Sequence, residues 1–316
     1  MKHLIDGLRG RATMRRLART LAENDELSGL TAPRFIRNRS GKLTFEATLD
    51  GHPVLVQRFT REDPPTVARN VHEAYRKLRE VMGDGAFTVP TPIAVVPEEG
   101  TVVTERVDGI PVRAMLREDP AAAADGLRRS GMWLARLHAA FPPYVRPVDI
   151  GKQAENLLGA PLRSRNAELR TFAQETLRTA RGWGVRSLPL VKFHKDFAPD
   201  NVVLGLEQTW AVDLTNTKRR LAALDLSHFL VAATRQTGPI EGPRDAGGVP
   251  LLLSEPFLEG YAAGQDTEMR ELAALFTRCW LAQKIGRGIV HSGFAKIAGN
   301  VAQYQELLAR RERNAA

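Results

Sequence analysis

The sequence lacks the features that mark secreted and membrane proteins. It contains one cysteine, Cys279, which excludes an internal disulfide and fits a reducing compartment. No apolar run reaches the roughly eighteen residues that a membrane-spanning helix needs. The first thirty residues are rich in arginine, and their few apolar residues are too sparse for the core of a secretory signal. We therefore expect a cytoplasmic protein.

Nucleic-acid-binding motifs are also missing, although the chain is basic. The formal net charge is +9 at pH 7, and such a surplus can attract nucleic acid, anionic lipid or an acidic substrate. The sequence has no zinc-ligand spacing, no aromatic RNA-binding motif and no glycine–arginine tract, so we expect no nucleic-acid partner. Two interpretations of the charge remain: a solvated basic surface, or a surface that binds an anionic lipid or substrate.

The basic N-terminal segment has two interpretations of its own. Residues 8–23 combine apolar and arginine side chains at helical spacing, and we expect residues 1–32 to form a basic helical extension. Such a helix can lie peripherally on an anionic surface, such as the inner face of a membrane. It can equally pack its apolar side against its own domain. The sequence indicates no oligomeric state.

Residues 33–108 have the pattern of a small α+β domain. Turn signals at residues 39–41 and at Asp50-Gly51 separate short apolar segments, and a helix is expected from Pro64-Pro65 to about Met82. The expected strands are Phe35–Arg37, Leu43–Leu49, Pro53–Phe59, Ile93–Val96 and Thr101–Arg106. This segment is therefore predicted to form a five-stranded antiparallel sheet with one main helix.

Residues 109–316 are mostly helical in pattern. Helices are expected over 121–140, 166–182, 224–236, 251–263, 267–290 and 296–312. Two short strands, Val202–Leu204 and Trp210–Val212, interrupt them, and the glycine- and proline-rich residues 237–250 are expected to form a loop. A β-rich part followed by a helical part predicts an α+β fold of two lobes with a cleft between them.

The strongest chemical signal is the segment His194–Asn201, which is followed by a predicted hairpin that ends at Asp213. Phosphoryl transfer from ATP needs a carboxylate near the attacking hydroxyl, a task suited to Asp196. It also needs oxygen ligands for Mg²⁺, a task suited to Asn201 and Asp213. Single residues of these types usually close turns or cap helices. Their ordered clustering favours catalysis.

These residues resemble the catalytic loop and metal-binding aspartate of the protein kinase-like superfamily, and most closely its small-molecule branch. That branch includes aminoglycoside phosphotransferases, choline and fructosamine kinases, and lipopolysaccharide core kinases. Three further segments match in the same order: the hinge-like Thr104–Gly109, the helix end Met132–His138, and Leu224–Leu226. The resemblance spans roughly residues 35–235. It implies a bilobal kinase-like fold and the use of ATP and Mg²⁺.

The resemblance also implies roles for individual residues. Asp196 would be the catalytic carboxylate, with Asn201 and Asp213 as the metal ligands. Asp225 would steady the catalytic loop from the following helix. The backbone of the segment that contains Glu105 and Val107 would bind the adenine edge.

Two neighbours of Asp196 have less defined roles. His194 is expected to brace the loop rather than to carry a proton. Lys195 stands where protein kinases have arginine and many small-molecule kinases have glycine. Its side chain can approach the γ-phosphate or an anionic substrate, or it can simply be solvated.

The nucleotide clamp departs from the family's pattern. Active members place a lysine on the third strand and pair it with a glutamate from the next helix. Here the best match for that lysine is Gln57, with Arg58 beside it. Because neighbours on a strand point to opposite faces, only one of the two can face the nucleotide. Glu73 is expected to be the helix glutamate, with Glu80 as the alternative.

Three hypotheses address the missing lysine. Arg58 can turn inward through a one-residue bulge and hold phosphate as a bidentate donor. Lys42, just after the first turn, can reach the phosphates instead. The third hypothesis is a pseudokinase that binds nucleotide poorly. The presence of Asp196, Asn201 and Asp213 favours an active enzyme.

The acceptor is not identified by the sequence. Lys218–Arg220 follows Asp213 closely, and such a basic chain is a poor match for polycationic aminoglycosides. A neutral sugar, a phosphorylated metabolite or a glycolipid fits better. We therefore expect an ATP- and Mg²⁺-dependent kinase of a small molecule, sugar or glycolipid, with a regulatory or scaffold pseudokinase as the alternative. A protein kinase is disfavoured because the stretch from Asp213 to Asp225 is too short for a typical activation segment.

Overall fold

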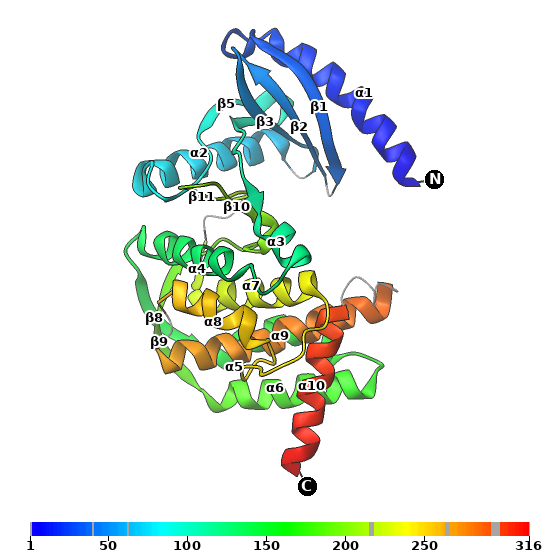
Figure 1. The fold of residues 1–316 in the computed structure, drawn as a ribbon, viewed down its shortest axis with the longest axis vertical. Coiled ribbons are helices and arrows are strands. Elements are labelled where there is room, and N and C mark those ends of the chain that lie inside the picture. Colours follow the sequence, from blue (N-terminus) through cyan, green and yellow to red (C-terminus); the bar gives the residue numbers. More distant parts are fainter. Residues whose placement is uncertain are drawn as a thin grey trace. The chain divides into compact units, whose positions relative to one another are not determined.

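The computed structural model describes residues 2–39, 41–61, 63–214, 218–262, 266–291 and 298–315. The chain forms two compact units, the first built mainly from residues 1–108 and the second from most of residues 109–316. Figure 1 labels the helices and strands of both units. Within the described ranges, no helix combines the length and the apolar character needed to span a bilayer.

The first unit contains the predicted five-stranded antiparallel sheet, in the strand order β1-β2-β3-β6-β5. Two helices, two short 3-10 turns and a two-residue strand complete it. The elements are α1 (Lys2–Ala22), η1 (Asp25–Leu27), β1 (Leu30–Arg39), β2 (Lys42–Leu49), β3 (His52–Phe59), α2 (Pro64–Met82), β4 (Phe87–Thr88), β5 (Pro92–Val96), η2 (Pro97–Glu99) and β6 (Thr101–Glu105).

Strand β1 is longer than the predicted Phe35–Arg37, because irregular backbone hides its start in the sequence. Ala32 has a positive φ of 49°, and the pairing with β2 shifts register between Thr31 and Arg34. Pro33, which cannot donate a ladder hydrogen bond, lies within this bulge. The strand alternation is therefore broken where β1 begins.

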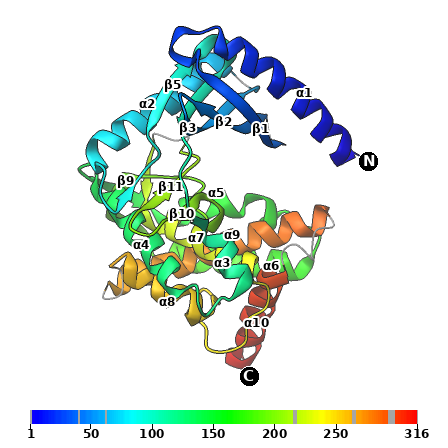
Figure 2. The same ribbon diagram turned by 45° about the horizontal axis from the view of Figure 1, so that its top comes forward.

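Helix α1 is part of the core of the first unit. Its apolar residues Met14, Leu17 and Leu21 are buried together with strand residues such as Phe45 and Val56. Helix α2 contacts β3, β5 and β6 instead, and Figures 1 and 2 show the two helices on opposite faces of the sheet. Because the apolar side of α1 is occupied by the sheet, the structure favours packing against its own domain over insertion into a membrane surface.

The second unit is mostly helical, as predicted, with two small antiparallel sheets in the orders β7-β10-β11 and β8-β9-β12. Its helices are α3 (Val112–Glu118), α4 (Ala124–Ala139), α5 (Ile150–Leu162), α6 (Ala167–Gly182), α7 (Ala222–Thr237), α8 (Leu251–Gly260), α9 (Thr267–His291) and α10 (Ala298–Ala315). Its strands are β7 (Ile110–Pro111), β8 (Tyr144–Asp149), β9 (Val185–Lys192), β10 (Val202–Leu204), β11 (Thr209–Ala211) and β12 (Arg219–Leu221), with a 3-10 turn η3 (Pro199–Asn201).

The β8–β9 pair and helix α5 were not predicted. Both strands contain a proline, Pro147 opposite Ser187 and Pro189 opposite Val145, and proline is unfavourable inside a ladder. Most of β8 is also exposed, so the strand has no buried face whose alternation would reveal it. The sequence pattern of these strands is therefore that of a loop.

An aromatic stack forms the part of the second core that lies beneath the predicted catalytic loop. Phe197, from that loop, stacks on Trp133 of α4 with ring centroids 5.5 Å apart. On another side it contacts Phe229 of α7 at 5.2 Å, and Phe229 stacks on Phe257 of α8 at 4.2 Å. Phe197 therefore anchors the loop in the core through its apolar ring.

Candidate active site

The predicted catalytic loop follows β9 and leads into β10. Its residues alternate sharply in exposure: Lys195 and Asp196 are exposed, whereas Phe197–Pro199 and Asn201 are buried. The buried ring of Phe197 fixes the loop from below. The carboxylate of Asp196 is consequently presented at the surface on an ordered support.

Asp225, in the first turn of α7, holds the loop backbone. Its carboxylate is fully buried and accepts the backbone N–H of His194 at 2.8 Å and that of Lys195 at 3.2 Å. A buried carboxylate that accepts several hydrogen bonds is a strong local restraint. The predicted bracing role of Asp225 is confirmed by these two contacts.

Two residues that are distant in sequence complete the support of Asp225. His138 Nε2 lies 3.2 Å from Asp225 Oδ2, and His138 Nδ1 lies 2.7 Å from the Tyr261 hydroxyl. Burial and the charge of Asp225 raise the pKa of Tyr261, so the phenol keeps its proton and donates to Nδ1. The Nε2–H of His138 then donates to the carboxylate. Tyr261 could not be identified from the sequence, because it belongs to no recognised motif and lies 123 positions from its partner, His138.

His194 has the environment of a packing residue. It is completely buried, with its ring edge-on to Trp133 at 5.9 Å and to Phe197 at 5.3 Å. Burial lowers the pKa of His194, which keeps the imidazole neutral. Its ring nitrogens have no hydrogen-bond partner among the described residues. These observations favour a bracing role over proton transfer.

Asn201 lies beside Asp196, and the β10–β11 hairpin brings the backbone that precedes Asp213 beside Asn201. Asn201 Nδ2 donates to the backbone oxygen of Asp196 at 2.8 Å and lies 3.4 Å from Asp196 Oδ2. The backbone N–H of Val212 donates to the backbone oxygen of Asn201 at 2.9 Å. This contact places the residue before Asp213 beside Asn201. Asp213 has a left-handed backbone with φ of 67°, an unfavourable conformation for a non-glycine residue that is common at functional sites.

The donor set of this corner fits Mg²⁺. Since Asn201 uses its NH₂ group toward Asp196, its amide oxygen is the atom left as a ligand, and Asp213 would add a carboxylate oxygen. Mg²⁺ is commonly held by one or two protein oxygens plus substrate phosphates, without a protein cage. Consistent with that mode, the described residues contain no cluster of three or more histidine, cysteine, aspartate and glutamate side chains that could hold a metal alone.

In the first unit, the strand register determines which clamp candidates share a face. Gln57 is paired with Thr44 on β2, and Lys42 lies two residues before Thr44 on the same face. Arg58 lies on the opposite face with Val54 and Val56, which belong to the core beside α1. The β2–β3 pairing is continuous over His52–Phe59, so no bulge turns Arg58 around. This register does not support the bulge hypothesis for Arg58.

The predicted pair between the strand and helix α2 is replaced by other ion pairs. Arg58 binds Glu99, with 3.0 Å between its guanidinium and the carboxylate. Glu73 binds Arg76 at 2.8 Å and Lys77 at 3.1 Å along its own helix, and Glu80 also pairs with Arg76. The hydrogen bonds from Arg76 and Lys77 lower the pKa of the exposed Glu73 to about 2. Neither glutamate is directed to Gln57 or Arg58.

The hinge-like segment lies at the end of β6. The Glu105 carboxylate accepts a hydrogen bond from the Thr91 hydroxyl at 2.7 Å. The backbone N–H of Glu105 donates to the backbone oxygen of Thr91 at 2.9 Å. Val107 lies two residues beyond Glu105, the last residue of β6, and outside the strand ladder. The structure thus fixes Glu105 in the sheet and leaves Val107 in the connecting segment.

Two polar groups beside the catalytic loop were missed by the sequence analysis. The Asp200 carboxylate accepts Arg113 at 2.8 Å and Gln236 at 2.7 Å, and Arg235 lies 3.7 Å from it. Lys284 of α9 lies one helical turn beyond Trp280, whose ring contacts His228 beside the loop, and the negative charge of Asp196 acts to raise the pKa of Lys284. The partners of Asp200 come from α3 and from the end of α7, far from the Leu224–Leu226 motif, and Lys284 comes from α9, so only the fold brings them to the loop.

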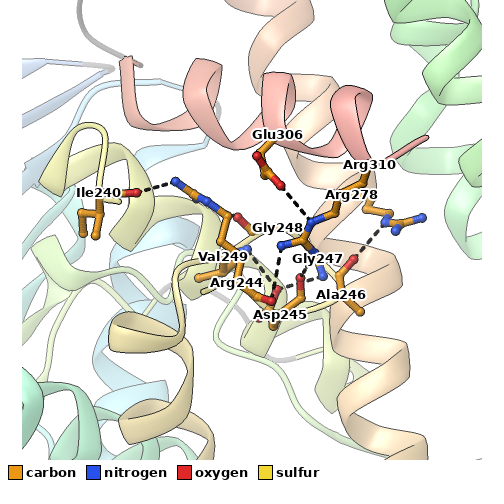
Figure 3. Close-up of polar contacts among 10 residues, drawn as sticks. All are labelled: Ile240, Arg244, Asp245, Ala246, Gly247, Gly248, Val249, Arg278, Glu306 and Arg310. Carbon is orange, nitrogen blue, oxygen red and sulfur yellow. Dashed lines mark hydrogen bonds and ion pairs between the residues drawn. The ribbon is translucent and has the colours of Figure 1, made fainter. Parts of the chain in front are cut away.

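The predicted loop 237–250 is fixed by an extensive set of polar contacts, shown in Figure 3. Asp245 Oδ1 accepts the backbone N–H groups of Gly247 at 2.8 Å and Val249 at 2.9 Å. Arg310 of α10 donates to the backbone oxygen of Asp245 at 2.9 Å, and Arg278 of α9 donates to that of Ala246 at 3.2 Å. These arginines bind backbone and intramolecular carboxylate groups, so this loop is structural.

An open hollow of about 600 Å³ lies elsewhere on the second unit. Its lining includes Trp183 and Arg186 beside α6 and Glu271 of α9. None of the predicted site residues belongs to that lining. The geometry around Asp196 is therefore the better candidate for an active site than this hollow.

Comparison with known proteins adds independent findings. A model of the phosphotransferase enzyme family matches residues 33–275. No curated protein matches the sequence significantly. The structure is similar to that of a choline/ethanolamine kinase family protein from Mesorhizobium loti, with 17% identity, a TM-score of 0.61, and 93% of this chain and 94% of that chain covered.

Two further solved structures have the same fold. One is the GDP complex of aminoglycoside 2'-phosphotransferase-IIIa, with 12% identity, a TM-score of 0.63, and 94% of this chain and 99% of that one covered. The other is a choline kinase from Streptococcus pneumoniae, with 12% identity, a TM-score of 0.54, and coverages of 94% and 98%. At these identities the similarity concerns the fold, which is the predicted kinase-like one.

Proposed function

The chain belongs to the phosphotransferase enzyme family, and from this premise we propose that it uses ATP and Mg²⁺ to phosphorylate a hydroxyl of a small molecule, sugar or glycolipid. As a family member it is a kinase whose acceptor is a hydroxyl group. The observation that carries the proposal is the contact of Asn201 with Asp196 on a loop that Asp225 and Phe197 fix, followed by a hairpin that returns the chain to Asn201 just before Asp213. The GDP bound in one structure of this fold supports the use of a nucleotide.

In the proposed reaction each residue of the loop has one task. The exposed Asp196 carboxylate accepts the proton of the acceptor hydroxyl, whose oxygen forms the new bond to the γ-phosphorus as the bond to the ADP oxygen breaks. Asn201 and Asp213 would hold Mg²⁺, which neutralises the charge of the phosphates when bound. Asp225 keeps the loop in place, and His194 stays neutral beneath it.

For the nucleotide phosphates we favour Lys42. Register puts Lys42 on the same face of the sheet as Gln57, the position where active members have lysine. Diagonal neighbours on a sheet face are about 7–8 Å apart at their Cα atoms, within reach of a lysine side chain. Arg58 is engaged by Glu99 on the other face. Lys42 therefore supplies a cation on the face from which the usual lysine is missing.

A pseudokinase is the second candidate, and one observation favours it. Gln57 carries no charge, and Glu73 is bound to Arg76 and Lys77, so the usual strand–helix ion pair does not form here. A pseudokinase would bind nucleotide weakly and form no product. The two candidates thus differ in a measurable activity.

The deciding experiment supplies labelled ATP and Mg²⁺ to purified full-length protein together with a cell extract. The wild type should form a labelled product, and Asp196→Ala should form none while it still binds ATP. Asp213→Ala should lose Mg²⁺-dependent ATP binding. The matched control is Asp125→Ala, which removes an exposed carboxylate from the first turn of α4. The absence of any labelled product with the wild type would favour the pseudokinase.

A further inference from the structure

Three basic side chains lie along the packed helices α7 and α9, beside the catalytic loop. This basic group consists of Arg235 on α7 and of Lys284 and Arg287 on α9. The two helices pack against each other and run side by side in both Figures 1 and 2. On α7, His228 and Arg235 are seven residues apart, and on α9, Trp280, Lys284 and Arg287 follow at intervals of four and three. Such intervals bring side chains to one face of a helix.

Histidine 228 connects this group to the catalytic loop. Its Nδ1 lies 3.0 Å from the backbone oxygen of Phe197, the residue after Asp196. Its ring meets Trp280 edge-on, with centroids 4.9 Å apart. Lys284 comes one turn after Trp280, and Arg235 lies 3.7 Å from Asp200 at the other end of the loop. The basic group therefore borders the loop from Asp196 to Asp200.

The charges in this group are poorly balanced. Burial, together with the charges of Arg235 and Arg287, lowers the pKa of Lys284 to about 8, while the charge of Asp196 acts in the opposite direction. The other carboxylate of the loop, Asp200, is shared among Arg113, Gln236 and Arg235, the last at 3.7 Å. Lys284 and Arg235 are half-buried, and Arg287 is exposed. Neighbouring like charges repel one another and reduce stability, so they are better explained by a ligand that they bind.

We propose that the acceptor carries an anionic group, a phosphate or a carboxylate, and that Lys284, Arg235 and Arg287 bind this group while the acceptor's hydroxyl meets Asp196. The inference rests on the proposed kinase function and specifies the substrate class of the same site. Charge-assisted hydrogen bonds from lysine and arginine are the usual means of recognising both anions. A polycationic acceptor would meet repulsion at the same position.

The alternative is that the basic side chains bind no ligand and have only a structural role. The stability and the kinetics of a Lys284 variant distinguish the two cases. A lysine whose pKa is lowered in the folded state destabilises the fold while it is protonated. Lys284→Met should therefore leave the melting temperature unchanged or raise it, whereas the Michaelis constant for the acceptor should rise. A structural role for Lys284 would instead lower the melting temperature and leave the Michaelis constant unchanged.

The test separates the acceptors by charge before the reaction. A detergent-containing cell extract is passed over an anion exchanger, and the retained and unretained fractions are each incubated with the full-length enzyme, labelled ATP and Mg²⁺. The labelled product should form from the retained fraction. Treatment of that fraction with phosphatase should abolish the acceptor if the anion is a phosphate monoester and spare it if the anion is a carboxylate.

Variants then assign the anion to the basic group. Lys284→Gln should raise the Michaelis constant of the acceptor fraction about tenfold to a hundredfold, the effect of losing one hydrogen-bonded charge pair, with little change for ATP. Lys284→Arg should restore most of the loss. The control is Arg178→Gln, which removes an exposed positive charge on α6.

Each outcome has a separate meaning. A product that forms from the unretained fraction would overturn the anionic acceptor but leave the kinase intact. An unchanged Michaelis constant in Lys284→Gln would likewise reject the role of this group. No product from either fraction, with the same result for wild type and Asp196→Ala, would instead refute the kinase function on which the inference rests.

Discussion

Asp225 Oδ2 accepts the backbone N–H of His194 at 2.8 Å, across 31 positions of sequence. Its Oδ1 accepts the next N–H, that of Lys195, at 3.2 Å. One buried side chain of α7 thus fixes the two residues that precede Asp196. The position of Asp196, the proposed catalytic carboxylate, is determined by this contact as much as by the loop's own sequence.

We expect Asp225→Asn to weaken this support. An amide has one acceptor oxygen in place of two and brings an NH₂ group toward backbone donors, so at least one buried N–H loses its partner. The free energy of unfolding should fall by about 1–3 kcal/mol, and kcat should fall with little change in the affinity for ATP. Urea unfolding and steady-state kinetics measure both. Tyr261→Phe, which removes only the outermost hydrogen bond of the network, should cost less, about 1 kcal/mol.

We expect Gly131→Ala to separate helices α4 and α8. A Cβ atom at Gly131 would lie 2.1 Å from the backbone oxygen of Phe257 and 2.7 Å from the backbone nitrogen of Tyr261. Backbone atoms cannot yield as a flexible side chain can, so the helices must move apart. The loss of stability should be about 1–3 kcal/mol, as measured by urea unfolding. Gly182→Ala, where a Cβ atom meets no neighbour within 4 Å, is the control and should not be destabilising.

Most of the secondary structure and the support of the candidate site could be predicted from sequence, for a specific reason. The catalytic loop, hairpin and bracing aspartate lie within 32 residues, from His194 to Asp225, so their order alone indicates their proximity. Tyr261 and Lys284 could not be predicted, because they reach the loop only through the packing of α8 and α9. The β8–β9 strands were missed since their prolines and exposed faces remove the usual strand pattern.

Strand β3 shows, for a single pair of residues, what the sequence alone does not determine. The sequence showed that only one of Gln57 and Arg58 can face the nucleotide, but not which. The pairing register and the buried neighbours Val54 and Val56 put Arg58 on the α1 face. Alternation along a strand is local information, whereas the identity of each face depends on which helix covers it.

We expect Lys42→Ala to weaken ATP binding more than Arg58→Ala does. Lys42 shares a face with Gln57, whereas Arg58 is bound to Glu99 on the other face. Removal of a phosphate-binding cation should raise the dissociation constant of Mg²⁺–ATP about tenfold or more. Arg58→Ala should act mainly on stability, by up to about 1 kcal/mol for a partly exposed ion pair. Titration calorimetry measures the affinity, and equal effects of the two variants would contradict the role of Lys42.

We expect Lys195→Gly to leave the fold intact and to isolate the role of the lysine charge. Lys195 has a left-handed backbone with φ of 74°, a conformation that costs a non-glycine residue about 1 kcal/mol and glycine little. The unfolding free energy should therefore change by less than about 1 kcal/mol, because the relief of strain offsets the greater freedom of glycine when unfolded. If the ammonium group contacts the γ-phosphate or the acceptor, kcat/KM should fall at least about tenfold. Unchanged kinetics would identify a solvated side chain.

The pH dependence of activity should report on Lys284. Its pKa of about 8 is below the 10.5 of an ordinary lysine, because of burial and the nearby Arg235 and Arg287, with Asp196 opposing. Binding of an anionic acceptor needs the protonated form, so kcat/KM for the acceptor should fall as the pH rises through about 8. His228, whose pKa is lowered by burial and by the charge of Lys284, is neutral throughout this range.

Stability should change in the opposite direction over the adjoining range. Between pH 8 and 10.5 the unfolded chain keeps the Lys284 proton that the folded chain has released, so the contribution of this residue to the free energy of unfolding increases with pH. Below pH 8 the lysine is protonated in both states, and its unfavourable contribution is fully present. Lys284→Arg should remove the decline in kcat/KM near pH 8, because arginine stays charged. A decline that persists in Lys284→Arg would assign it to another group and remove the pH evidence for an anion at Lys284.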